Sequence, residues 1–388
     1  MKNRKLLMIP GPIEFDSDVL AAMSMPTESH VSPDFIECFG KCLDLMQEIW
    51  QAPVGQAFII AGSGTLSMDM AAANLVERGD QVLVVSSGYF GERFETIFKR
   101  YGAETKILSL APGESVSIEA IEEELKANDY KILSFTHVDT STGVLMDAQR
   151  IGALCRKYNV LSVLDGVCSV AAEEIKQEAW GLDVVLTASQ KAIGVPPGLA
   201  LLVASPLAME SWSNRKTEVG NYYADWSNWL PIMQAYQSRK PSYFGTPPVN
   251  LIMALELSLT KIKAEGITVR FARHKTLANA FRKAIDSIGL KMVPRNESHA
   301  ASTLSAVYYP KDIDPGKLLK NISEKNVIMA GGLHPEIKHL YFRVGHMGSV
   351  NSNDLMACLS ALEFALQQQN FKFEAGKSLR IFQEAISF

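Results

Sequence analysis

A lysine and an aspartate that follow two apolar runs of the sequence could do chemistry together. Asp165 comes directly after the apolar residues 160–164, and Lys191 follows the apolar residues 184–186. The two are 26 residues apart, which is about the length of one strand-to-strand connection in an α/β sheet. We therefore expect the lysine amine and the aspartate carboxylate to reach one cleft.

This pairing of an amine with a carboxylate suggests a pyridoxal phosphate site. The cofactor needs a lysine whose amine condenses with its aldehyde, and an acid that keeps its pyridine nitrogen protonated. Each residue alone also has an ordinary explanation, because most lysines are solvated surface residues and an aspartate after a strand often caps a helix or a turn. The interpretation as a cofactor site therefore depends on further parts of the site in the same sequence.

A glycine-rich turn, residues 62–65, lies between an apolar run and a helix-like stretch. Its backbone N–H groups, a hydroxyl and the helix N-terminus that follows favour a phosphate group. A nicotinamide dinucleotide is disfavoured, because the turn lacks the third glycine of the GxGxxG pattern and Asp80 precedes the next apolar run instead of ending it. A plain glycine turn is the structural alternative.

Phe90 offers an aromatic ring after the apolar run 82–85. This ring could lie on one face of a pyridine ring, because aromatic faces stack favourably when they are offset. An aromatic residue after a strand is more often ordinary packing, so this role depends on the rest of the site.

Seven short runs rich in branched aliphatic residues indicate strands at 57–60, 82–85, 105–108, 132–135, 160–164, 184–186 and 199–203. Helix-like stretches lie between most of them, at 66–76, 92–101, 118–127 and 147–158. Apolar strands that alternate with helices predict an α/β fold with a mostly parallel seven-stranded sheet covered on both faces. Ligands collect beyond the carboxyl ends of such strands, and several polar clusters of this sequence meet there.

The pattern changes after about residue 206. We expect an irregular, aromatic-rich stretch up to residue 248, followed by helices and short strands at 251–265, 269–288, 305–309, 340–344 and 353–367. A chain of 388 residues exceeds the size of a single core, so we expect two domains. We divide the chain into an N-terminal arm (1–15), a large domain (16–248) and a smaller C-terminal α+β domain (249–388).

The composition is that of an ordinary soluble globular chain, with 47% hydrophobic and 21% charged residues. A net charge of −4 gives no general attraction to nucleic acid or anionic lipid, and no stretch of the sequence approaches the length of a membrane span. The five cysteines form no CxxC pair, which argues against a disulfide framework and against a zinc or other metal site. We expect a cytoplasmic protein that acts on small molecules.

Taken together, these parts resemble the class V aminotransferases of pyridoxal phosphate fold type I, and within them the alanine–glyoxylate and serine–pyruvate aminotransferases. The motifs that carry the resemblance are residues 9–12, 61–65, 136–143, 165–169, 189–191, 243–248 and 342–348. They lie in order along essentially the whole chain, and several ordered motifs are far more specific than any one of them.

The resemblance implies two catalytic residues. Lys191 would hold the cofactor covalently and then move a proton between the substrate Cα and the cofactor, while Asp165 would pair with the pyridinium nitrogen. Arg343 would bind the substrate carboxylate as a bidentate pair, helped by the backbone around Gly11. The implied reaction moves an amino group from L-alanine or L-serine to glyoxylate or pyruvate, in two half-reactions with ping-pong kinetics.

The resemblance also implies cofactor contacts. The residues that would hold the phosphate are Ser63, Gly64, Thr65 and Gln190, with Tyr243 and Thr246 from the neighbouring subunit of a homodimer with shared active sites. Thr140 would contact the ring near its hydroxyl, and Val167 would pack on the ring face opposite Phe90. Many relatives have tryptophan in place of Phe90, and some have histidine in place of Thr65, so a possible extra charge beside the phosphate is missing here.

Other activities stay open at this point. The same scaffold could transfer the amino group of a ureide such as ureidoglycine to glyoxylate. A lyase such as a cysteine desulfurase would need a mobile nucleophilic cysteine near the cleft, whereas we expect Cys168 to be buried packing beside the cofactor. A cofactor-free α/β binding protein is the non-enzyme alternative. The motifs show no second basic residue for a dicarboxylate side chain, which disfavours L-glutamate and L-aspartate as donors.

Overall fold

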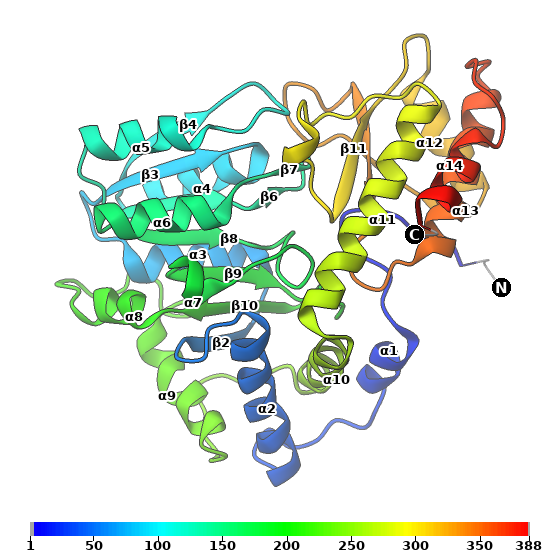
Figure 1. Ribbon diagram of the computed structural model, residues 1–388. Helices are drawn as coiled ribbons and strands as arrows, with labels where there is room; N and C mark the ends of the chain where they lie inside the picture. The colour runs from blue at the N-terminus through cyan, green and yellow to red at the C-terminus, as the bar shows by residue number, and fades with distance from the viewer. Residues whose placement is uncertain (1–3, 387–388) are drawn as a thin grey trace.

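A seven-stranded sheet lies at the centre of the larger part of the molecule (Figure 1). The computed structural model describes residues 4–386, so the first three residues of the predicted arm and the last two of the predicted C-terminal domain lie outside it. The strands, in their order across the sheet, are β2 (Gln56–Ala61), β10 (Leu199–Ala204), β9 (Val184–Ala188), β8 (Leu161–Asp165), β5 (Ile132–Thr136), β3 (Gln81–Ser86) and β4 (Glu104–Ser109). Only β10 runs antiparallel to its neighbours within this described sheet, so the predicted mostly parallel seven-stranded sheet is confirmed.

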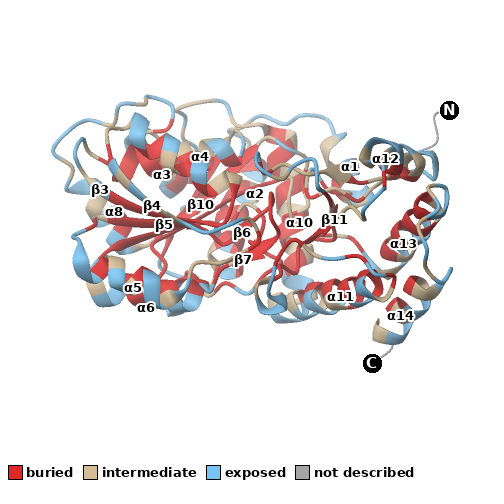
Figure 2. Cartoon of the chain, turned by 90° about the horizontal axis from the view of Figure 1, so that it is seen from above, coloured by how far each residue is buried: buried red, intermediate tan, exposed pale blue. Residues whose placement is uncertain are grey.

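Burial on both faces explains why these runs form strands. Every residue of β8, β9 and β10 is buried, and leucine, valine and alanine dominate these strands. Helices α3 (Gly64–Leu75) and α4 (Tyr89–Arg100) cover one face of the sheet, and α5 (Ile118–Ala127) and α6 (Ala148–Tyr158) cover the other, as Figure 2 shows. Each of the four lies within three residues of the helix predicted there, so both covering layers are confirmed.

The stretch after residue 206 contains two helices, so the prediction of an irregular segment is wrong there. α8 (Pro206–Ser213) begins after the capping residue Ser205, and α9 (Trp226–Gln237) begins after the capping residue Asp225. The buried side chains of α9 recur at helical spacing: Trp226, Trp229, Ile232, Met233 and Tyr236. Pro231 inside α9 and the many aromatic residues obscured this period, because both disfavour a helix.

Within residues 4–386, further α-helices form where none was predicted: α1 (Ser17–Met23), α2 (Pro33–Ile49), α7 (Gln177–Trp180), α12 (Pro315–Glu324) and α14 (Lys377–Ile386). α2 packs against α9 and against α10 (Val249–Glu265) beside β2, as Figure 1 shows. Apolar residues of α10, such as Leu255, belong to the core of the large sheet. Gly266, with φ +83°, then joins α10 to α11 (Ile267–Ser287). The predicted domain bounds stay a prediction.

The C-terminal part of the chain is α+β. Its antiparallel sheet has the order β11 (Leu304–Tyr308), β14 (Tyr341–Gly345) and β13 (Ala330–Gly331). α11 and α13 (Ser352–Gln367) pack with it around a second core, which includes Phe281 and Phe342. The shorter elements are β1 (Leu6–Leu7), paired with β12 (Val327–Ile328), the hairpin of β6 (Val138–Asp139) and β7 (Val144–Leu145), and the 3-10 turn Glu297–His299. No helix among residues 4–386 combines the length and the apolar character needed to cross a membrane.

Candidate active site

Asp165 and Lys191 line one cavity at the carboxyl ends of the parallel strands. Asp165 is the last residue of β8, and Lys191 lies in the connection between β9 and β10. The cavity has a volume of about 240 Å³. Most of the predicted site residues line it: Gly11, Ser63, Gly64, Thr65, Phe90, Thr140, Asp165, Val167, Gln190 and Lys191. The structure therefore brings the lysine, the aspartate and the glycine-rich turn into one place.

The amine of Lys191 is buried against the N-terminal segment. Its Nζ donates a hydrogen bond to the carbonyl of Pro10. The next residue is Gly11, whose φ of +131° suits glycine, and a Cβ at this position would lie 2.6 Å from Lys191 Nζ. Burial lowers the pKa of Lys191, and the positive charge of Arg343 lowers it further. A larger share of neutral amine makes this lysine a better nucleophile and base.

The carboxylate of Asp165 is buried and has few partners. Oδ1 accepts a hydrogen bond from the Val167 N–H at 3.0 Å, and Oδ2 lies 3.5 Å from the Thr136 hydroxyl. Burial raises the pKa of Asp165 from 3.8 to about 6, and the negative charge of Asp139 adds to the rise. A protonated ring nitrogen beside Asp165 would stabilise its ionised form, so this carboxylate fits the pyridinium of pyridoxal phosphate.

The turn between β2 and α3 presents hydrogen-bond donors to the same cavity. α3 begins at Gly64, so its first N–H groups have no partner within the helix, and Ser63 makes no side-chain cap bond in the described part of the chain. Gln190 Oε1 is buried and has no hydrogen-bond partner among residues 4–386. Free N–H groups and a free hydroxyl fit the phosphate of the cofactor, whereas Gln190 would have to donate to it from the Nε2 end of its amide.

Phe90 is positioned by Asp139, which the sequence did not single out as a site residue. The fully buried carboxylate of Asp139 accepts hydrogen bonds from the N–H groups of Phe90 and Gly91 at 2.9 and 3.4 Å. It also accepts from the N–H and the hydroxyl of Ser141 at 2.8 and 2.6 Å. A carboxylate at the start of α4 satisfies its free N–H groups and stabilises the positive end of the helix. Asp139 therefore fixes Phe90 at the cavity wall.

Arg343, Tyr243 and Thr246 are predicted site residues that lie outside the lining of this cavity in the described chain. Arg343 on β14 donates from Nε to the Gly331 carbonyl at 2.9 Å and from Nη1 to the Thr140 carbonyl at 3.1 Å, so it stands directly behind a lining residue. The side chain of Tyr243 is 61% exposed, and its hydroxyl lies 3.4 Å from that of Thr246. These two residues are not part of the lining of this cavity.

Further residues line the cavity without having been predicted as site residues: Pro12, Met68, Arg93, Thr136, Val138, Cys168 and Pro197. The sequence held a signal for Arg93, because it stands three residues after Phe90 and four after Tyr89 and so shares a helix face with both. Burial raises the pKa of Cys168 to about 11, so its thiol stays protonated at neutral pH. The expectation that Cys168 is buried packing beside this site is confirmed.

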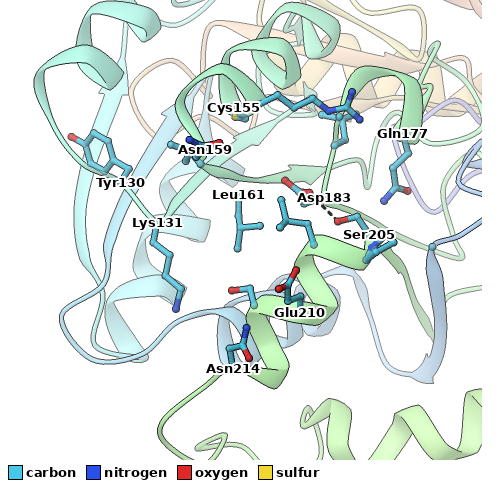
Figure 3. A pocket seen from close by; sticks show the side chains of 18 of the residues that line it. Tyr130, Lys131, Cys155, Asn159, Leu161, Gln177, Asp183, Ser205, Glu210 and Asn214 are labelled. Carbon is cyan, nitrogen blue, oxygen red and sulfur yellow. Dashed lines mark hydrogen bonds between the residues drawn. The ribbon is translucent and has the colours of Figure 1, made fainter.

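A larger cavity lies at the opposite edge of the sheet (Figure 3). Its volume is about 1040 Å³, and its lining includes Lys131, Leu161 and Asp183, which stand at the starts of β5, β8 and β9. Asp183 accepts a hydrogen bond from the Ser205 hydroxyl at 2.9 Å in this cavity, as Figure 3 shows. No predicted site residue of the described chain lines it. Ligands of α/β sheets collect at the carboxyl ends of the strands, whereas this cavity lies at their amino ends.

Comparisons with known proteins identify the family of the chain. The sequence model of the aminotransferase class-V family matches residues 18–350. Alanine–glyoxylate aminotransferase 1 of Saccharomyces cerevisiae is 36% identical over 385 residues, covering 95% of this chain and 99% of the yeast protein. Serine–glyoxylate aminotransferase of Arabidopsis thaliana is 28% identical, covering 97% of this chain and 94% of the plant protein.

A solved structure extends the likeness to the fold. The crystal structure of ureidoglycine–glyoxylate aminotransferase from Bacillus subtilis superposes with a TM-score of 0.93 and 25% identity, covering 100% of this chain and 99% of that chain. The family match includes both the lysine and the aspartate, and the yeast protein matches almost from end to end. From its sequence, its fold and its cavity, the chain belongs to the class V aminotransferase family, the pyridoxal-phosphate-dependent transaminases of fold type I.

Proposed function

We propose that this transaminase moves the amino group of L-alanine or L-serine to glyoxylate or pyruvate. The observation that carries the proposal is the buried Lys191 with its lowered pKa, which shares one cavity with the buried carboxylate of Asp165. The names of all three relatives described above contain glyoxylate, and those of the yeast and plant proteins contain alanine and serine. These names support alanine and serine as donors and glyoxylate as the acceptor, and pyruvate rests on the resemblance described from the sequence.

We infer that the lining residues hold pyridoxal phosphate. Thr140, Phe90 and Val167 would contact the ring, and the residues that would hold its phosphate are Ser63, Gly64, Thr65 and Gln190. When bound, the cofactor supplies an aldehyde that accepts the amino group and a ring that draws electrons from the substrate Cα. The protein has to move a proton at the substrate Cα and keep another on the ring nitrogen.

Lys191 is the residue that would move the proton at the substrate. Its lowered pKa favours the neutral amine more than in an exposed lysine, and a neutral amine can take the proton from Cα and donate it to the neighbouring carbon. Asp165, whose pKa burial raises to about 6, would be stabilised in its ionised form by the ring cation and would hold the proton on the ring nitrogen. Lys191 would therefore gain and lose a proton during turnover, whereas Asp165 would stay ionised throughout.

Arg343 would bind the substrate carboxylate. Its Nε and Nη1 donate to backbone carbonyls, which leaves Nη2 without a hydrogen bond in the described part of the chain. The second N–H of Nη1 and both N–H groups of Nη2 are therefore left to form a bidentate pair with a carboxylate. Because one of these carbonyls belongs to Thr140, the bond also holds the guanidinium next to a residue of the proposed cofactor site.

We infer a homodimer in which Tyr243 and Thr246 complete the phosphate site of the neighbouring subunit. Both residues lie on an exposed segment away from their own cavity, while Ser63 and Thr65 are exposed at the edge of that cavity. A surface segment with free hydroxyls on one copy would thus meet an open phosphate turn on the other. A cytoplasmic location, expected from the free thiols, stays a prediction.

One other transamination has support. The likeness to ureidoglycine–glyoxylate aminotransferase of Bacillus subtilis covers the whole chain, so a ureide donor is the second candidate. A desulfurase reaction needs a thiolate at the substrate, and burial keeps the Cys168 thiol protonated by raising its pKa to about 11. This lyase alternative therefore has less support than it had from the sequence.

The test is the visible absorption spectrum of the purified protein loaded with pyridoxal phosphate. L-alanine, L-serine and L-glutamate are added in turn, and glyoxylate follows. We expect alanine or serine to remove the band of the bound cofactor and glyoxylate to restore it. A band that only ureidoglycine removes would favour the second candidate, and a protein that develops no band at all would contradict the cofactor assignment.

A further inference from the structure

A second basic side chain stands beside the proposed cofactor site. Arg93 lies in the first half of α4, and together with Lys191 it supplies the basic side chains that line the cavity in the described chain. The phosphate contacts implied by the family resemblance do not include it, and the proton transfers proposed above do not use it. No role has therefore been assigned to the positive charge of Arg93 so far.

Two hydroxyls and two aromatic rings hold Arg93 in place. Nη1 donates to Thr65 Oγ1 at 3.3 Å, and Nη2 donates to the Tyr89 hydroxyl at 3.2 Å. The guanidinium carbon lies 4.9 Å from the ring centroids of both Tyr89 and Phe90. Within residues 4–386 the guanidinium forms no ion pair with a carboxylate of the chain. The positive charge of Arg93 is therefore available to a ligand of the cavity.

The bond between Arg93 and Thr65 also orients the threonine hydroxyl. Because arginine only donates, Thr65 Oγ1 is the acceptor and its own hydrogen is left to point to another group. Thr65 is the second residue of α3, next to the free N–H groups at the start of that helix. The glycine-rich turn, residues 62–65, contains no basic side chain, so these donors alone bring no full positive charge.

We propose that Arg93 is the cationic partner of the cofactor phosphate and that it positions Thr65 as a donor to the same phosphate. The proposal rests on the proposed function, since it takes the phosphate to bind at the start of α3. A phosphate ester carries between one and two negative charges at neutral pH, and a guanidinium is permanently charged and offers several donors in one plane. The charge that is missing at position 65 is thus supplied by the next helix.

The packing of Arg93 on Phe90 has a separate effect that the test must distinguish. A guanidinium over an aromatic face stabilises the position of the ring, and Phe90 would in turn contact the pyridine ring of the cofactor. Arg93→Gln keeps part of the stem and removes the charge. Arg93→Lys keeps the charge and removes the planar group that donates to Thr65 and Tyr89 together.

The test compares pyridoxal phosphate with pyridoxal, which lacks only the phosphate. Each is titrated into cofactor-free wild-type protein and into both variants, and binding is followed by visible absorption. We expect Arg93→Gln to bind pyridoxal phosphate about tenfold to a hundredfold more weakly, with pyridoxal affinity changed by less than about twofold and Arg93→Lys in between. Arg100→Gln, at the exposed end of α4, is the matched control and should bind both ligands as the wild type does.

Inorganic phosphate gives a second readout without any ring. It should raise the unfolding temperature of the cofactor-free wild type more than that of Arg93→Gln, whereas equal shifts would contradict the proposal. Equal losses of affinity for pyridoxal phosphate and pyridoxal would overturn it too, because they would show that Arg93 acts through Phe90. An unchanged affinity for pyridoxal phosphate would have the same force. A wild-type protein that binds neither ligand is a different result, since it would refute the proposed function itself.

Discussion

At the scale of single residues, burial moves the two central groups toward their neutral forms. It lowers the pKa of Lys191 and raises that of Asp165 to about 6. A neutral amine can form a bond with an aldehyde. Burial makes the ionised form of a carboxylate less stable, and a cationic ring nitrogen beside it would offset this effect. The same exclusion of water therefore prepares both groups for the proposed cofactor.

Lys191→Ala should abolish transamination and leave the fold intact. The variant loses the amine that moves the proton, so we expect kcat/KM to fall at least about 10³-fold. Its circular dichroism should match the wild type, since the lost hydrogen bond is the one to the Pro10 carbonyl. Lys311→Ala, at an exposed position, is the control and should keep full activity. Near-normal turnover of Lys191→Ala would refute the assignment of this lysine.

Asp165 should make the stability of the cofactor-free protein depend on pH. Its pKa is about 6 in the folded protein and 3.8 when it is exposed, so between these values the folded state keeps a proton that the unfolded state has released. The free energy of unfolding therefore falls as the pH rises through this window, by roughly 3 kcal/mol, and stays lower above it. Asp165→Asn cannot titrate and should lack this component.

Urea unfolding of both proteins across the window measures the effect as a difference between wild type and variant. The subtraction removes contributions of other buried acids, such as Glu173, whose pKa burial raises to about 7. Two unfolding free energies that change in parallel with pH would show that Asp165 does not titrate in this range.

At the scale of elements, the site depends on how the β6–β7 hairpin meets the start of α4. Asp139, the last residue of β6, accepts four hydrogen bonds, two of them from the N–H groups of Phe90 and Gly91. The orientation of α4 sets the positions of Phe90 and Arg93 together, because both lie on its first turns. One buried carboxylate thus governs an aromatic and a cationic contact of the cavity.

Asp139→Ala should loosen the start of α4 and weaken cofactor binding. Its removal leaves buried donors without a partner, and we expect a loss of about 1–3 kcal/mol in the free energy of unfolding. Amide hydrogen exchange should become faster in the first turn of α4. Asp147→Ala is the matched control: Asp147 caps α6 by accepting from the Arg150 N–H at 3.0 Å, away from the cavity. It should lower stability without changing cofactor affinity, and unchanged exchange in Asp139→Ala would contradict the positioning role.

The sheet and much of the cavity lining were predictable because their signals are local. Strands buried on both faces appear as continuous apolar runs, and the residue after each run falls at the carboxyl edge where Asp165 and Lys191 lie. The glycine-rich turn before α3 was recognisable for the same reason. These features require no knowledge of which distant segments meet.

Arg93 and Asp139 were not assigned to the site because their partners are distant in the sequence. Arg93 meets Thr65 over 28 residues, and Asp139 meets Phe90 over 49. Such contacts depend on how α3, α4 and the β6–β7 hairpin pack together. The periodicity of the sequence does not describe this packing. α9 escaped prediction for a different reason, since its aromatic residues and Pro231 disfavour a helix until burial compensates.

At the scale of the whole molecule, one side chain of α11 connects the segment after Asp165 with the segment after Lys191. Arg270 is 7% exposed and donates to the carbonyls of Ala171 and Ala192 at 2.8 and 2.7 Å. Ala171 lies in the turn that begins at Asp165, and Ala192 follows Lys191 directly. The C-terminal part of the chain therefore supports the segments that carry both proposed catalytic residues.

The proposed homodimer predicts that two defective subunits restore one active site. Subunits with Lys191→Ala are combined with subunits that carry Tyr243→Phe and Thr246→Ala, and heterodimers are isolated with two different affinity tags. If the phosphate site is shared, one site of the heterodimer carries every defect and the other carries none, so we expect about half of the wild-type activity. Each parent homodimer should remain poorly active.

A heterodimer as inactive as its parents would show that each subunit binds the phosphate alone. A protein that is monomeric in solution with full cofactor affinity would also refute the shared site. Tyr243 and Thr246 are exposed, and Tyr243→Phe removes only a hydroxyl, so we expect these changes to leave the fold intact.

The connection that carries Lys191 also bears on the order in which the active site assembles during refolding. β9 and β10 are antiparallel neighbours, and Ser189 closes the connection between them by accepting from the Leu199 N–H at 3.2 Å and donating to the Pro196 carbonyl at 2.8 Å. Asp165 depends instead on the parallel pairing of β8 with β5, whose partners lie further apart in the chain. Local contacts form sooner than distant ones. The β9–β10 pair with Lys191 can therefore form before the β8–β5 pairing brings Asp165 into place. Cofactor added to a refolding chain would then leave the early kinetic phases unchanged and stabilise only the product of the last one.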